Sequence, residues 1–186
     1  MGFDKADLIL EQRTFLAIAV GKLRPLAERI FLVGGPHRYP ETRTLEDLIP
    51  DAGPLGGILT VLSSAVADRM LIMAVDLPLI KNATLQGLVR ASKNADITVI
   101  CTPDGRKHPL CAVYSKRCIE PIRALLHSGS RRVDQLLGIP GLAVRMLACE
   151  ELGCRPEELS NVNTREDLDR VQRLRSSCGK DGPSEQ

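Results

Sequence analysis

The sequence contains no tryptophan, and aromatic residues make up only 3% of its 186 residues. Few side chains are therefore available to stack on single-stranded bases or to form the aromatic belt of a membrane protein. The sequence also lacks an apolar run near the ~20 residues that span a bilayer, and its first residues lack the charged-then-apolar layout of a signal peptide. We therefore expect a cytoplasmic protein that makes no membrane contact.

An excess of one charge is missing as well. The 25 basic and 23 acidic residues leave a formal net charge of +2, which provides no broad basic face for nucleic acid. The six cysteines form no C-x-x-C pair, so neither a zinc site nor a redox motif is indicated. We expect most of the cysteines to be small buried apolar residues, and the binding partner to be a small molecule.

The length and the apolar fraction of 44% are typical of one globular domain, which we expect to cover residues 1–175. Residues 176–186 are rich in Ser, Gly, Asp and Pro and are expected to form a disordered tail. The expected strands are residues 30–33, 71–75, 97–101, 109–114 and 142–147. The expected helices are residues 55–66, 117–126 and 132–137, and three that begin after Thr14, Asn82 and Thr164. This alternation predicts an α/β fold, a three-layer α/β/α sandwich with a mostly parallel, Rossmann-like sheet.

The apolar run of residues 71–75 ends abruptly in Asp76, and Pro78 follows two positions later. The run is typical of a buried strand, and open α/β sheets bind their ligands at the carboxyl ends of their strands. A single carboxylate at a strand end is a candidate metal ligand. The same pattern also occurs where an aspartate caps a helix or forms a turn.

Two further segments suggest phosphate contacts. Lys5 lies in an irregular segment before any regular element, where it could hold a phosphate as a point charge or simply be solvated. Gly53, Gly56 and Gly57 surround the expected start of a helix and would leave its first backbone N–H groups open to a ligand. The alternative interpretation of these glycines is a tight loop that needs them for its backbone conformation.

Two polar segments occur later in the chain. His108 enters an expected strand from a turn, where it either faces a substrate or has a structural role. Asn161 and Asn163 precede the helix that Thr164 is expected to cap. These amides and the threonine satisfy local backbone groups whether or not they also contact a ligand.

Taken in chain order, these motifs resemble the MobA family, the molybdenum cofactor guanylyltransferases, within the nucleotide-diphospho-sugar transferase-like fold. The resemblance covers residues 1 to about 174 and rests on Met1-Gly2-Phe3-Asp4-Lys5, Pro50-Asp51, Gly53-Pro54-Leu55-Gly56-Gly57, Ala74-Val75-Asp76-Leu77-Pro78, His108-Pro109-Leu110, Arg131-Arg132-Val133 and Asn161-Val162-Asn163-Thr164. The last two stretches favour the molybdopterin branch over other nucleotidyltransferases.

The resemblance implies a reaction in which the terminal phosphate of molybdopterin, or of the molybdenum cofactor, attacks the α-phosphorus of GTP and releases pyrophosphate. It implies that Lys5 pairs with the triphosphate and that Asp76 holds Mg²⁺, so both are candidate catalytic residues. The implied nucleotide contacts are Lys5, Asp51, Gly53, Pro54, Leu55, Gly56 and Asp76. The implied contacts to the pterin substrate are His108, Asn161 and Asn163. Molybdoenzymes or their chaperones would be further partners.

The sequence departs from the family pattern in two places. Members begin with an apolar strand and a Leu-Ala-Gly-Gly-type loop, and this sequence starts after both. Gly34 also stands where relatives often carry an asparagine that contacts the base, which leaves a molybdopterin cytidylyltransferase as an alternative. A second alternative is a non-catalytic remnant that binds the pterin or a partner protein.

We predict that the coding sequence begins ~15–20 codons upstream of Met1, from the usual length of a strand and its loop. The genomic DNA before this ATG tests the prediction. An open frame encoding an apolar strand and a glycine-rich loop is the expected result. An in-frame stop immediately before Met1 would contradict it.

Overall fold

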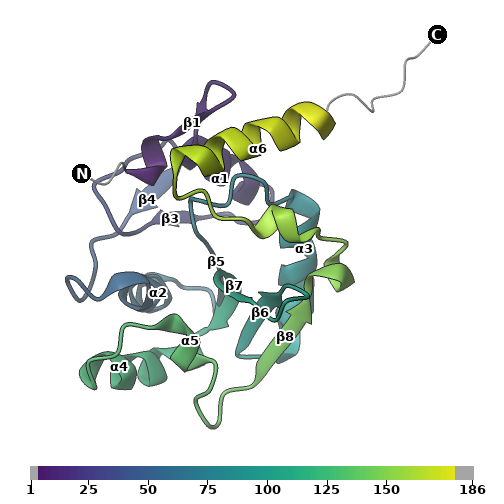
Figure 1. Ribbon diagram of the computed structural model, residues 1–186. Helices are drawn as coiled ribbons and strands as arrows, with labels where there is room; N and C mark the ends of the chain where they lie inside the picture. Colours follow the sequence, from purple (N-terminus) through teal and green to yellow (C-terminus); the bar gives the residue numbers. More distant parts are fainter. Residues whose placement is uncertain (1–3, 179–186) are drawn as a thin grey trace.

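The structure is a computed structural model that describes residues 4–178 (Figure 1). The strands are β1 (Ile9–Leu10), β2 (Arg13–Thr14), β3 (Ile30–Leu32), β4 (Thr42–Thr44), β5 (Arg69–Met73), β6 (Ile97–Cys101), β7 (Lys107–Ser115) and β8 (Val144–Ala148). The α-helices are α1 (Phe15–Leu23), α2 (Gly53–Ser64), α3 (Asn82–Ala91), α4 (Ile119–His127), α5 (Val133–Leu136) and α6 (Arg165–Cys178). The 3-10 helices are η1 (Lys5–Asp7), η2 (Ser92–Asn94), η3 (Lys116–Cys118), η4 (Cys149–Leu152) and η5 (Pro156–Leu159). Among these helices, none has the length and apolar character needed to cross a membrane.

The main sheet has the strand order β5-β7-β6-β8. Strand β7 is antiparallel to both β5 and β6, while β8 is parallel to β6, so β5, β6 and β8 all run in one direction. The reversed direction of β7 follows from the short turn that joins it to β6, because a hairpin can connect only antiparallel strands. In this turn Gly105 has a φ of +81°, as the Pro-Asp-Gly sequence leads one to expect.

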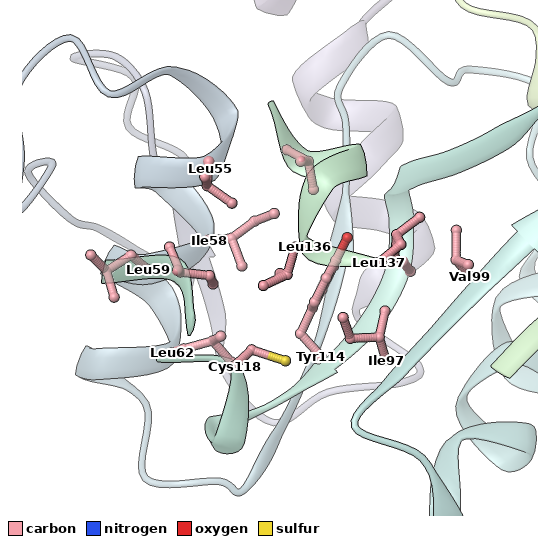
Figure 2. Packing of buried hydrophobic residues seen from close by; sticks show 13 residues of the cluster. Leu55, Ile58, Leu59, Leu62, Ile97, Val99, Tyr114, Cys118, Leu136 and Leu137 are labelled. Carbon is pink, nitrogen blue, oxygen red and sulfur yellow. The ribbon is translucent and has the colours of Figure 1, made fainter. Parts of the chain in front are cut away.

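Helices cover both faces of the main sheet, which confirms the expected three-layer arrangement. In Figure 1, α2, α4 and α5 lie on one side of the sheet and α3 lies on the other. Alternate residues of β7 point to opposite layers: Tyr114 packs with α2 and α5, and Val113 packs with Leu85 and Leu88 of α3. Figure 2 shows the buried side chains between the sheet and helices α2 and α5, which point toward one another with the Tyr114 ring among them. Of the five cysteines described, four are buried, as expected from the sequence.

The first and last helices pack together away from the main sheet. Phe15 and Ile18 of α1 form a small apolar cluster with Val171 of α6 and with Val162, which precedes that helix. Figure 1 shows α6 lying across the segment that contains β1 and α1. This packing brings the two ends of the described chain to one region of the molecule.

Strands β3 and β4 form a separate parallel pair, so the sheet is divided. Within residues 4–178, β3 pairs only with β4, and one edge of β5 makes no strand pair. A cavity of about 1310 Å³ lies between β3 and β5, and its lining includes Phe31 of β3 and Ile72 of β5.

Local signals in the sequence locate most elements, with exceptions at their ends. Thr14 caps α1, because its hydroxyl accepts a hydrogen bond of 3.1 Å from Ala17 N. The prediction for Asn82 was wrong: Lys81 is the N-cap of α3 and makes no side-chain capping bond. Helix α6 extends to Cys178, which includes the first three residues of the expected tail, and residues 179–186 lie outside the described part.

Asp96 connects three strands of the main sheet. It is 4% exposed, and its carboxylate accepts hydrogen bonds from Ala143 N (2.9 Å), Ser115 Oγ (3.0 Å) and Arg117 Nη1 (3.2 Å). The hydrogen bond from Ala143, with further contributions from Ser115 and the charge of Arg117, holds the pKa of Asp96 below its usual value despite its burial. The charged form of Asp96 therefore stabilises the folded state.

Asp96→Asn should lower the free energy of unfolding at pH 7 by about 2–4 kcal/mol, because an amide has one acceptor oxygen where the carboxylate has two. A carboxyl with a lowered folded pKa stabilises the fold above its unfolded pKa, here 3.8, and loses this contribution as the pH falls through the folded pKa. Urea unfolding at pH 7 and pH 3 should show that the free energy of unfolding falls more between the two pH values for the wild type than for the variant. The exposed Asp68→Asn is the control, and an equal pH dependence of wild type and Asp96→Asn would contradict the prediction.

Candidate active site

Asp76 lies at the carboxyl edge of the main sheet, just after β5. The strand hydrogen bonding continues past β5, since Ala74 N donates to Leu110 O at 2.7 Å. Two residues later the chain is held from the other side, where Val162 N donates to Asp76 O at 3.0 Å. Asp76 is only 6% exposed as a result. The expected strand-end position of this carboxylate therefore agrees with the structure.

Two residues far from Asp76 in the sequence, Lys5 and Asn161, contact its side chain, and Asn163 in turn contacts Lys5. Lys5 Nζ forms an ion pair with Asp76 Oδ2 at 2.8 Å and also donates to Asn163 Oδ1. Asn161 Nδ2 donates to the same Asp76 oxygen at 3.3 Å. We call Lys5, Asp76, Asn161 and Asn163 the carboxylate cluster. The sequence motifs named all four residues, but only the fold brings them together.

The second carboxylate oxygen of Asp76 has no partner. Oδ1 is buried and makes no hydrogen bond within the described residues, whereas Oδ2 accepts from Lys5 and Asn161. Buried polar atoms in native proteins are normally paired, so an orphaned carboxylate oxygen beside a candidate site calls for a ligand. Hard divalent cations such as Mg²⁺ prefer carboxylate and other oxygen ligands. Asp76 therefore fits the expected metal ligand.

Asp4 and His37 hold the segment that carries Lys5. Asp4 caps η1 by accepting a hydrogen bond from Ala6 N at 3.0 Å, and its other oxygen bonds to His37 Nε2 at 2.8 Å. The Ala6 and His37 hydrogen bonds lower the pKa of Asp4. Asp7 lies near the other ring nitrogen of His37, at 4.0 Å. These contacts were not predicted, because no local pattern in the sequence links position 37 to position 4.

The glycine-rich segment opens α2 as expected. Asp51 and Gly53 have φ values of +57° and +63°, and with Pro54 they line the cavity between β3 and β5. Ala52 is the N-cap of α2 and makes no side-chain capping bond. The start of α2 and Asp51 therefore lie at the wall of a large cavity, which is compatible with nucleotide binding.

Two members of the segment have mainly structural roles. The Leu55 side chain is fully buried in the core, so any ligand contact from this residue would have to come from its backbone. At Gly56, an added Cβ would lie 2.4 Å from the Ala52 Cβ. The close approach of the chain requires glycine there, which supports the alternative interpretation for this position.

His108 lies outside the carboxylate cluster. It is 7% exposed, its Nε2 makes no hydrogen bond within the described residues, and it lines a separate cavity of about 370 Å³. Burial, with a smaller effect from the nearby Arg106 charge, lowers the pKa of His108, so the ring is neutral at pH 7. His108 makes no hydrogen bond or ion pair with Asp76, but both residues lie at the same edge of the sheet, where β5 ends and β7 begins.

Comparison with known proteins agrees with this geometry. Residues 1–140 match the family model of the MobA-like NTP transferase domain. A probable molybdenum cofactor guanylyltransferase of Methanothermobacter thermautotrophicus is 33% identical over 181 residues, which cover 90% of this chain and 90% of that protein. A protein of the same description from Flavobacterium johnsoniae is 28% identical over 172 residues, covering 90% and 87% of the two chains.

Solved structures share the fold at lower sequence identity. Molybdopterin-guanine dinucleotide biosynthesis protein A from Archaeoglobus fulgidus has a TM-score of 0.79 at 21% identity, covering 95% of this chain and 92% of its own. The 2-C-methyl-D-erythritol 4-phosphate cytidylyltransferase from Thermus thermophilus has a TM-score of 0.72 at 16% identity, covering 95% and 100%. The family match and the Methanothermobacter relative together establish that the chain belongs to the MobA-like NTP transferase domain family.

Proposed function

We propose that this chain is a molybdenum cofactor guanylyltransferase, which transfers GMP from GTP to the terminal phosphate of molybdopterin or the molybdenum cofactor. An oxygen of that phosphate attacks the α-phosphorus of GTP, a new phosphoanhydride bond forms, and pyrophosphate leaves. The description of the relatives as probable molybdenum cofactor guanylyltransferases supports the assignment. The family to which the chain belongs is one of nucleotidyltransferases.

The observation that carries the proposal is the pairing of Lys5 with one oxygen of Asp76 while the other oxygen stays buried without a partner. Nucleotidyl transfer needs no side-chain nucleophile and depends on positioning and on neutralising charge on phosphate oxygens. Lys5 supplies one positive charge at the strand end. The unpaired oxygen of Asp76 provides a ligand for a second, divalent charge.

The remaining residues position the substrates. Mg²⁺ held by Asp76 would neutralise phosphate oxygens of GTP. Asn163 holds the Lys5 ammonium and Asn161 holds the Asp76 carboxylate, so the two amides fix the geometry of the charged pair. The nucleoside would lie toward the start of α2, where Asp51 and Gly53 line the cavity beside β3.

Lys5→Met and Asp76→Asn should each lower kcat/KM for GMP transfer by about 10²–10³-fold, since each removes a charge that stabilises the transition state. Steady-state pyrophosphate release measures this. Lys116→Met is the matched control, because the Lys116 ammonium is bonded to Val66 O at the other end of β5. Activity of either variant within threefold of the wild type would contradict the proposed roles.

The non-catalytic remnant predicts no Mg²⁺-dependent binding of GTP, whereas the transferase predicts such binding. Isothermal titration of the wild type with GTP should show binding that depends on Mg²⁺, and Asp76→Asn should lose this dependence. A wild type that binds no GTP with or without Mg²⁺ would identify the remnant and refute the transferase.

A cytidylyltransferase is the second candidate, and Gly34 is the observation that favours it. This residue lies two positions after β3 with a φ of +88°, and as a glycine it has no side-chain amide with which to contact a base. We expect GTP to be used in preference to CTP, since the relatives are described as guanylyltransferases. Steady-state pyrophosphate release, measured with GTP and with CTP under the same conditions, distinguishes the two candidates. A higher kcat/KM for CTP would overturn the guanylyl assignment.

A further inference from the structure

The loop after β3 contacts two parts of the candidate site. Gly34, two positions past β3, lines the cavity beside the start of α2. His37, three residues further along the same loop, bonds through its Nε2 to Asp4 Oδ2 at 2.8 Å. Asp4 directly precedes Lys5, whose ammonium pairs with Asp76. One loop therefore borders the space proposed for the nucleoside and also contacts the segment whose lysine is proposed to meet the triphosphate.

His37 is held in place from the side of the β3–β4 pair. Its carbonyl oxygen accepts hydrogen bonds from Thr44 Oγ1 of β4 at 2.6 Å and from Arg38 Nη1 at 3.1 Å. Its ring lies close to Gly35, where an added Cβ would be 3.2 Å from the ring carbon Cδ2. Because the backbone and ring of His37 are already ordered by these neighbours, its bond to Asp4 costs little additional conformational entropy.

The bond from His37 acts on a short segment. Helix η1 has only the three residues Lys5–Asp7, and its N-cap Asp4 accepts a hydrogen bond of 3.0 Å from Ala6 N through the other carboxylate oxygen. A single 3-10 turn has few internal hydrogen bonds, so contacts from outside must fix its orientation. Asp7, the last residue of the turn, lies 4.0 Å from the second ring nitrogen of His37. The His37 ring therefore faces both ends of η1.

A second charged contact already fastens the same loop to the rest of the protein. Glu41 Oε2 pairs with Arg24 Nη2 at 2.9 Å, and Arg24 is the C-cap of α1. The contact made by His37 differs, because it ends one residue from Lys5. Loss of the Glu41 pair would loosen the loop, whereas loss of the His37 bond would release the segment that carries the lysine.

We propose that His37 is a positioning residue for nucleotidyl transfer, which acts through Asp4 to fix the Lys5 ammonium relative to the loop beside the nucleoside. The inference rests on the proposed function for the role of Lys5. His37 does not touch the transferred phosphate. It keeps Lys5 at Asp76 while the nucleoside lies toward the loop after β3, and this spacing matters because phosphoryl and nucleotidyl transfer depend on positioning.

His37→Ala should lower kcat/KM for GMP transfer by about tenfold, because Lys5 loses its fixed position. His37→Gln keeps a side-chain N–H that can donate to Asp4, so it should stay within about threefold of the wild type. The double variant His37→Ala/Lys5→Met should be no slower than Lys5→Met alone, because a residue that acts through Lys5 has no effect once the lysine is gone. A fall of about tenfold in both backgrounds would overturn the proposal, since it would show damage that does not pass through Lys5.

Glu41→Gln is the matched control. It removes the ion pair between the same loop and Arg24, and the Glu41 side chain is 76% exposed. Its kcat/KM should remain within about twofold of the wild type, since exposed ion pairs contribute little to stability. A loss of activity in Glu41→Gln equal to the loss in His37→Ala would overturn the proposal, because any loosening of the loop would then be sufficient.

A measurement without nucleotide separates this inference from the proposed function. Acetic anhydride labels lysine side chains, and mass spectrometry of the peptides gives the labelling rate of each. Since Lys5 is held by Asp76 and Asn163, His37→Ala should raise its labelling rate by about threefold and leave that of Lys116 unchanged.

The two measurements together assign each outcome. A wild type that transfers no nucleotide, combined with faster labelling of Lys5 in His37→Ala, would support the positioning of Lys5 by His37 and refute the transferase. An active wild type, combined with unchanged labelling of Lys5 and unchanged kcat/KM in His37→Ala, would overturn the role of His37 and leave the transferase standing.

Discussion

The ion pair between Lys5 and Asp76 is the interaction on which the candidate site depends. It links η1 near the start of the chain to the end of β5, and Asn161 and Asn163 add the segment before α6. Because Asp76 is nearly buried, loss of Lys5 would leave a carboxylate in a poorly solvated position with only an amide as partner. The arrangement is therefore both a structural contact and the source of the charge pattern that a triphosphate would meet.

The direction of the strands explains why so many polar residues gather at one edge. Strands β5 and β6 end at this edge, and β7 begins there because a short turn reverses the chain. Asp76, the turn after β6 and His108 are consequently close in space although β6 lies more than twenty residues beyond β5. The segment from η5 to Asn163 closes the same edge, since Val162 N bonds to Asp76 O. The antiparallel strand β7 thus brings His108 to this edge, while β5 and β6 still run in the same direction.

The division of the sheet leaves a large cavity beside the start of α2. The start of α2 faces the cavity between β3 and β5, where strand edges and apolar side chains are left without a partner among the described residues. The cavity that His108 lines is smaller, and charged residues make up more of its lining.

The sequence alone determined the alternation of elements, the cap at Thr14, the turn at Gly105 and the four members of the carboxylate cluster, because these depend on local patterns or on motifs that stay adjacent in the chain. Strand ends and the cap of α3 were less certain, since neighbouring residues compete for such positions. The tertiary structure alone decided that Asp4 pairs with His37, that Leu55 is in the core and that His108 lies outside the carboxylate cluster. These contacts join residues far apart in the chain, and no local pattern encodes such a distance until the sheet and its helices have packed.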